Sequence, residues 1–245
     1  MFGEVIGDGT AWLLILASAG TSLFTAAFGI GGGILLLALM GLFLPATALI
    51  PIHGIVQIGS NAGRVAIMVR NVQVWVLAPF VAGSILGAAL GGSIAVQLPP
   101  AWMKIGLGCF ILFSVWRPTA TTLRNHSLFV GGAFSSFLTM FFGTTGPFVS
   151  TLIKSLKLER LAHIATHSAC MTAQHTVKVM AFGILGFAYV PWLPFIAVMI
   201  LSGFIGTLIG RRLLMAMTDT HFHTILKWIL TALALMLVRE GWSLL

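Results

Sequence analysis

The chain has 245 residues, of which 58% are apolar and 7% are charged, and its mean hydropathy is +1.06. Because a soluble domain carries about 25% charged residues, this composition excludes a water-facing globular surface. The 13 Lys and Arg residues, against 5 Asp and Glu, are scattered near the ends of apolar segments, which is typical of membrane topology and not of nucleic-acid binding. We therefore predict an all-α integral membrane protein.

Apolar stretches separated by short polar segments follow one another along the chain. Most of them have the roughly 20 residues that a helix needs to cross a bilayer. Two are interrupted, by Gly29–Gly33 and by Gly143–Pro147, and runs of glycine or proline break helices. The predicted stretches are 12–44, 52–69, 74–97, 101–117, 127–153, 162–184, 192–210 and 223–240.

The basic residues also predict which loops face the cytoplasm. Basic residues in 117–126 and 154–160 place both loops inside, so the segment 127–153 is expected to turn back as a helical hairpin. The same reasoning gives a hairpin over 12–44, with both termini external, in a multi-pass protein of the inner (plasma) membrane. The alternative is an eight-span protein in which each interrupted stretch is one kinked helix, since broken helices are tolerated when buried in protein.

The chain also resembles itself, which predicts two repeats, residues 1–120 and 121–245. Each contains a hairpin or broken helix and three further spans, an odd number of crossings, so the second copy is expected to be inverted. Inverted repeats are typical of transporters with a site near the membrane midplane. The matches at an offset of 114 residues include Ser22/Ser136, Thr25/Thr139, Phe28/Phe142, Gly29/Gly143, Gly32/Gly146, His53/His167 and Arg64/Lys178, and Gly87/Gly206 and Gly91/Gly210 match at an offset of 119.

Two stripes of polar residues occur at helical spacing in the repeats. No Asp or Glu accompanies them, because we expect all five acidic residues at termini or in loops. An unpaired buried cation is costly, so an anion from solution is a candidate partner for Arg64 and Lys178. Alternatively, Arg64 snorkels to the cytoplasmic surface and the histidines are satisfied core residues. The stripes are His53, Gln57, Asn61 and Arg64 in 52–69, and His167, Gln174, His175 and Lys178 in 162–184.

The glycine breaks supply a second element of a predicted anion site. A helix that starts after such a turn has free N–H groups and a partial positive charge, and glycine lets a ligand approach the backbone. Close helix packing is the alternative, and we favour it for Gly83, Gly87 and Gly91 and for Gly206 and Gly210. The candidate ligands at the breaks are Gly29, Gly31, Gly32 and Gly33, and Gly143, Thr144, Thr145 and Gly146.

The sequence predicts no catalytic residues, no metal site and no cofactor. Cys109 and Cys170 lie in apolar segments without metal-ligand spacing. The expected partners are a small anion and the lipid bilayer, with the proton as a candidate coupling ion because histidine titrates near neutral pH. Nucleic acid is not an expected partner, and no pattern specifies an oligomeric state.

Residues Phe28–Gly33, followed by Pro51-Ile52-His53 and Asn61-Ala62-Gly63-Arg64, resemble the TauE/SafE family of sulfite and organosulfonate permeases, also called the toluene sulfonate uptake permease family. The resemblance covers nearly the whole chain and implies transport of sulfur-containing anions such as sulfite, thiosulfate or sulfoacetate. The second half departs from the glycine-rich form at Gly143–Pro147, which points to this turn for substrate preference. Because the family includes exporters and importers, the resemblance implies no direction.

We therefore expect a secondary transporter that exposes a midplane anion site alternately to either side. An anion channel built on the same site is one alternative. A thiol-dependent sulfur-handling protein using Cys170 near His167 is another, although a cysteine in apolar surroundings is usually inert.

Overall fold

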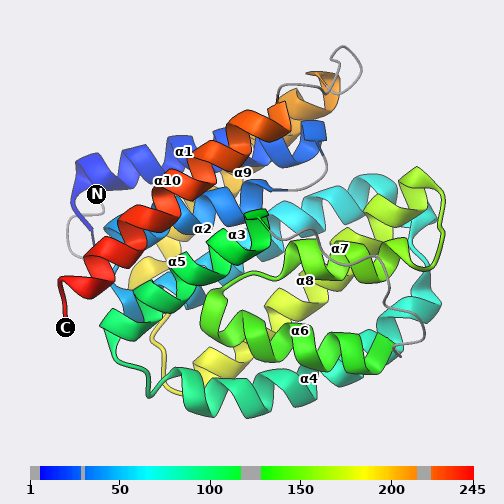
Figure 1. Ribbon diagram of the computed structural model, residues 1–245. Coiled ribbons are helices and arrows are strands. Elements are labelled where there is room, and N and C mark those ends of the chain that lie inside the picture. The colour runs from blue at the N-terminus through cyan, green and yellow to red at the C-terminus, as the bar shows by residue number, and fades with distance from the viewer. Residues whose placement is uncertain (1–5, 29–30, 117–127, 214–221) are drawn as a thin grey trace.

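The computed structural model describes residues 6–28, 31–116, 128–213 and 222–245. All regular elements in these residues are helices, packed side by side in one bundle (Figure 1), which confirms the predicted all-α class. The elements are α1 (Asp8–Phe28), α2 (Gly32–Phe43), α3 (Ala46–Met68), η1 (Val69–Asn71), α4 (Val74–Ala95), α5 (Pro100–Trp116), α6 (Leu128–Phe142), α7 (Gly146–Lys154), α8 (Arg160–Ile184), η2 (Val190–Trp192), α9 (Leu193–Leu213) and α10 (Phe222–Trp242).

Each predicted apolar stretch coincides with one helix or, at the two glycine breaks, with a pair of helices. The breaks follow from backbone conformation: Gly31 has φ 109° and Gly143 has φ 71°, values that L side chains rarely adopt. A helix cannot continue through such a residue, so α1 and α6 end there and α2 and α7 begin.

The chain turns back on itself at both breaks. In the second pair, Gly131 near the start of α6 contacts Leu152 near the end of α7, and the Phe134 and Phe148 rings lie 5.5 Å apart between these positions. In the first pair, Gly32 at the start of α2 packs against the backbone of α1 at Thr21. Each shorter helix therefore runs back beside the longer helix that precedes it.

The outside of the molecule is apolar, and the polar side chains of its central helices are buried. Large apolar side chains such as Leu90 on α4 and Leu208 on α9 are exposed, whereas the polar residues of α3 and α8 are buried. In the described part of the chain, three helices are long and apolar enough to cross a membrane by length and composition: Asp8–Ala26, Val74–Ala95 and Val190–Gly210. Helices α3 and α8 are as long, with 23 and 25 residues, but their interior polar residues lower their hydropathy.

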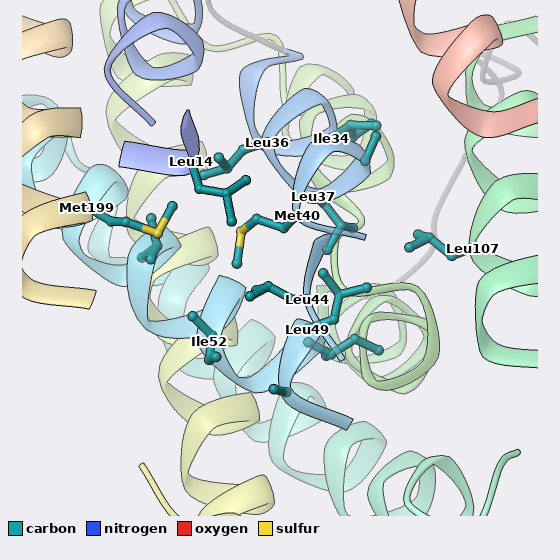
Figure 2. Packing of buried hydrophobic residues seen from close by; sticks show 14 of the residues in the cluster. Leu14, Ile34, Leu36, Leu37, Met40, Leu44, Leu49, Ile52, Leu107 and Met199 are labelled. Atoms are coloured by element: carbon teal, nitrogen blue, oxygen red, sulfur yellow. The ribbon is translucent and has the colours of Figure 1, made fainter. Parts of the chain in front are cut away.

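A cluster of buried apolar side chains joins the first three helices to α5, α9 and α10. Figure 2 shows Leu14 of α1, Met40 of α2 and Ile52 of α3 pointing toward one another, with Met199 of α9 beside them. Because lipid is as apolar as these side chains, the cluster is held by close packing and not by exclusion of water.

Glycines bring two pairs of helices into backbone contact. Gly87 of α4 lies against the carbonyl oxygen of Ala133 in α6, and Gly206 of α9 lies against that of Ala19 in α1. One turn further along, Gly210 meets the carbonyl of Leu23, so α1 and α9 run parallel. The prediction that these glycines serve close helix packing is confirmed.

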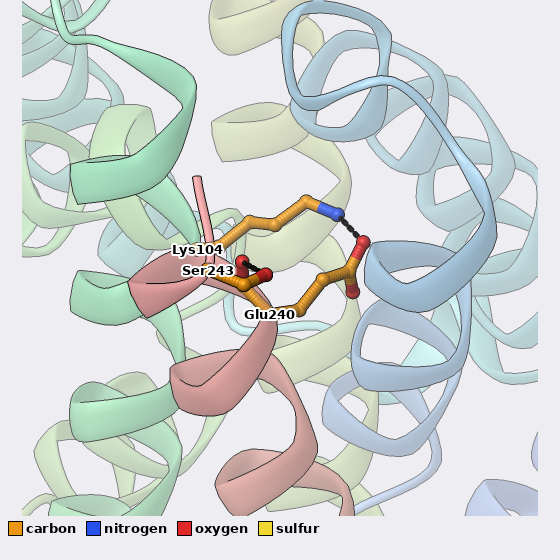
Figure 3. A network of polar contacts seen from close by, with 3 residues as sticks. All are labelled: Lys104, Glu240 and Ser243. Carbon is orange, nitrogen blue, oxygen red and sulfur yellow. Dashed lines mark hydrogen bonds and ion pairs between the residues drawn. The ribbon is translucent and has the colours of Figure 1, made fainter. Parts of the chain in front are cut away.

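One buried cation is paired at the end of the bundle where α5 meets α10. Lys104 forms an ion pair with Glu240, and the hydroxyl of Ser243 donates to the Glu240 carbonyl at 2.8 Å (Figure 3). Glu240 lies in the last turn of α10, close to the C-terminal residue Leu245, and so near a terminus as we expect for the acidic residues. The carboxylate is tolerated there because the ammonium group of Lys104 compensates its charge.

Candidate anion-binding site

The polar residues of α3 form a continuous row along one helical face. The His53 and Gln57 side chains approach to 3.2 Å, Asn61 donates to the Gln57 side chain at 3.3 Å, and Arg64 donates to Asn61 at 2.7 Å. All four are buried. The prediction that spacings of 4, 4 and 3 residues place them on one face is therefore confirmed.

The row on α3 faces the corresponding row on α8. Arg64 lies opposite Ser168, with Nε 3.4 Å from Oγ, and Gly54 lies opposite Lys178, whose Cε is 2.8 Å from where a Gly54 Cβ would be. The pairing runs in opposite directions along the two helices, so α3 and α8 are antiparallel. The rings of His53 and His175 are perpendicular between them, with centroids 6.0 Å apart.

Two histidines that match each other at the sequence offset of 114 residues bind the first turns of the short helices. His53 Nε2 lies 3.0 Å from the Gly33 carbonyl of α2, and His167 Nε2 lies 3.1 Å from the Gly146 carbonyl of α7. His53 Nε2 is also close to Gln57, and a neutral ring nitrogen can donate to the carbonyl or accept from the amide, but not both. Each histidine thus ties its own helix to the start of a returning helix.

The starts of α2 and α7 carry free donors. Neither helix has a side-chain cap. The first bonded N–H in α2 is that of Leu35, which donates to the Gly31 carbonyl, and the first in α7 is that of Val149, which donates to the Thr145 carbonyl. The N–H groups of Gly33 in α2 and of Phe148 in α7 therefore have no hydrogen-bond partner among the described residues. Such helix starts attract negative charge, and α7 is open beside Gly146, where the nearest atom to an added Cβ is 3.9 Å away.

The two interior cations have only neutral partners in the described part of the chain. Lys178 is 0% exposed and donates to the Gly143 carbonyl at 2.8 Å, so it caps the C-terminal end of α6. Arg64 is 8% exposed and donates to Asn61, Ser60 and Ser168. The alternative that Arg64 snorkels out of the protein is wrong, because its guanidinium group lies inside among these side chains.

The turn between α6 and α7 is fixed by a triangle of side chains. Thr145 Oγ1 lies 2.7 Å from Ser135 Oγ and accepts from Gln174 Nε2 at 2.9 Å, and Ser135 donates to Gln174 Oε1 at 3.1 Å. The neighbouring Thr144 is buried, and none of the three bonds of this triangle involves it. Thr145 therefore serves the architecture of the turn, while Thr144 has a donor to offer to a ligand.

This division predicts different effects of two matched substitutions. Thr145→Val is expected to lower the free energy of unfolding by about 1–3 kcal/mol, because it removes the acceptor of the buried Gln174 amide. Thr144→Val is expected to leave stability nearly unchanged, since none of these bonds is lost. Thermal unfolding of both purified variants in detergent measures the difference, and equal melting temperatures would contradict the role given to Thr145.

Of the sixteen candidate residues, fifteen lie in the described part of the chain and Gly29 lies outside it. They gather where α3 and α8 meet the starts of α2 and α7. Sequence reasoning missed two serines: Ser135, which holds Thr145 and Gln174, and Ser168, which binds Arg64.

The fold and the interior together define a class: a multi-pass helical membrane protein whose buried face is lined by cations, imidazoles and neutral donors. The site offers no metal-ligand group of three or more His, Cys, Asp or Glu among the described residues.

The model of the family described as Sulfite exporter TauE/SafE matches residues 14–237, so the chain belongs to the TauE/SafE sulfite exporter family and is a membrane transporter, not an enzyme. This confirms the resemblance seen in the sequence. Searches of curated proteins and of solved structures found no match.

Proposed function

We propose that this protein is a secondary transporter of small sulfur-containing anions, namely sulfite, thiosulfate or an organosulfonate such as sulfoacetate. The observation that carries the proposal is that Lys178 and Arg64 are buried cations whose partners among the described residues are all neutral. An isolated buried charge costs several kcal/mol, and a bound anion would offset that cost. The hydroxyl of Thr144 and the N–H groups at the starts of α2 and α7 add neutral donors suited to oxyanions.

The two halves, 1–120 and 121–245, are proposed to be inverted repeats. Two-fold related copies exchange contacts, so that if one residue meets another, their counterparts meet as well. Gly87 meets the Ala133 carbonyl, and the counterparts Gly206 and Ala19 make the same contact. This correspondence supports a two-fold relation between the halves.

The central helices support an inverted relation in particular. Arg64 contacts Ser168, and the counterparts Lys178 and Gly54 also lie against each other. Because α3 and α8 are equivalent in the two repeats and antiparallel, the two-fold axis would lie in the plane of the membrane, as alternating access requires. Both termini would then lie on the external side, as the charge distribution predicts.

Lys178 and Arg64 lie at two different levels along the pair of helices α3 and α8. Gly54, beside Lys178, and Arg64 are ten residues apart on α3, which corresponds to about 15 Å along the helix. We infer that an anion is passed between the Lys178 and Arg64 levels as the halves move, and is not held by both at once.

Counterflow in proteoliposomes tests the function. Vesicles loaded with unlabelled sulfite are expected to accelerate uptake of labelled sulfite, and Arg64→Gln is expected to reduce uptake about 100-fold by removing about 3 kcal/mol of charged contacts. Arg70→Gln is the matched control, because Arg70 is exposed in η1, outside the site, and transport should be retained.

Other outcomes decide against the proposal. Rapid, non-saturating anion current without counterflow would indicate a channel. Full transport by the Arg64→Gln variant would remove Arg64 from the site, and no transport of any sulfur oxyanion by the wild-type protein would exclude this substrate class.

A further inference from the structure

His175 stands apart from the other interior histidines. Its side chain is 0% exposed, and neither ring nitrogen has a hydrogen-bond partner among the described residues. His53, His163 and His167 each have at least one partner through Nε2. The neutral ring of His175 is therefore buried with one hydrogen-bond donor and one acceptor that have no partner among the described residues.

This arrangement is unfavourable in the empty site. A buried polar group without a partner is destabilising, and an imidazole carries two such groups. Packing alone would be served better by an apolar residue. The position therefore points to a ligand that satisfies the ring when it binds.

The groups that face His175 determine whether its ring can hold a proton. From α3 comes His53, whose Nδ1 is also without a partner among the described residues. From its own helix come Lys178, one turn along, and His167, two turns back. Gly54 of α3 and the Gly143 carbonyl, at the end of α6, lie against Lys178. These surroundings hold positive and neutral groups, and the described residues offer no carboxylate there.

Charge decides the protonation state in such surroundings. In the empty site a proton on His175 would add a second cation one turn from Lys178, which is unfavourable at low dielectric. An oxyanion beside Lys178 reverses this balance, because it attracts the proton and accepts the N–H bond. Proton and anion thus favour each other's binding.

We propose that His175 takes up one proton from solution when the anion binds and releases it when the anion leaves, so that the protein couples anion movement to a proton. The inference rests on the proposed function, since it names the coupling residue of that site. The balance is one proton bound per anion bound, with no covalent bond made or broken.

Proton uptake on binding is the direct test. The probe is sulfoacetate, or thiosulfate if sulfoacetate does not bind, because both stay fully ionised between pH 6 and 8 whereas sulfite titrates there. Calorimetry in two buffers of different ionisation enthalpy is expected to give about one proton per anion for the wild-type protein. The affinity should fall about tenfold per pH unit once the free histidine is neutral.

Two variants and a control localise the proton. His175→Gln and His175→Asn keep a neutral polar side chain, and each is expected to bind more weakly, with proton uptake near zero and an affinity independent of pH. His163→Gln is the control, because His163 is half-buried and bonded to Ser150. The proton uptake of this variant on anion binding should equal that of the wild type.

The failures are distinguishable. Anion binding by the wild type without proton uptake overturns the inference and leaves the proposed function standing. Unchanged uptake in either folded His175 variant assigns the proton elsewhere and also overturns it. Absence of any sulfur-oxyanion binding or transport by the wild type overturns the proposed function itself. If both variants fail to fold, the wild-type proton stoichiometry alone decides.

Discussion

Lys178→Met is expected to abolish anion binding and leave the protein folded. Methionine fills nearly the volume of the lysine stem, so the packing against Gly54 is kept. The lost ammonium group removes the proposed charged contact to the anion, which corresponds to about 3 kcal/mol or a roughly 100-fold loss of affinity. Stability should be equal or higher, because the buried cation has only the Gly143 carbonyl as partner among the described residues.

Lys104→Met is the matched control for this prediction. Lys104 is also a buried lysine in a helix, but it pairs with Glu240 at the α5–α10 contact. Its removal leaves a carboxylate without its cation, so the melting temperature should fall while anion affinity is retained. Thermal unfolding with and without ligand measures both properties. If Lys178→Met lowered the melting temperature more than Lys104→Met and left affinity unchanged, Lys178 would be a structural residue.

Gly206→Ala is expected to be strongly destabilising although Gly206 lies outside the site. A Cβ at Gly206 would overlap the carbonyl oxygen of Ala19 in α1. A backbone atom cannot move aside by a change of rotamer, so α1 and α9 would have to separate along their length. Overpacking of this kind costs about 1–3 kcal/mol or more, and in a membrane the small residue is what permits the close contact.

Gly20→Ala gives the matched control on the partner helix. Gly20 follows Ala19 in α1, and a Cβ there meets no atom within 4 Å. Because alanine is a better helix former by about 1 kcal/mol, this variant should melt at the wild-type temperature or slightly above it. Size-exclusion profiles after heating in detergent distinguish the two, and equal melting of Gly206→Ala and wild type would show that the α1–α9 contact is looser than described.

The helices could be predicted because their signals are local. Apolar runs fix the positions of α4 and α9, and the glycines at 31 and 143 end α1 and α6 through their own backbone conformation. The row from His53 to Arg64 follows from helical periodicity alone. Contacts across the bundle have no such signal: Arg64 and Ser168 are 104 positions apart, and only the antiparallel packing of α3 on α8 brings them together.

The sequence by itself determined that this is a helical membrane protein with broken helices, polar interior rows and no carboxylate in those rows. These properties depend on composition and on periods of a few residues, which hold whatever the final packing. Only the tertiary structure decided how the polar groups are paired. Thr145, and not Thr144, bonds to Gln174 at the turn between α6 and α7. Among the described residues, Lys104 has a carboxylate partner and Lys178 has none, and His175 has no hydrogen-bond partner. The physical reason is that a hydrogen bond or ion pair exists only where two side chains meet within about 3 Å, and helix packing, not sequence spacing, sets that distance.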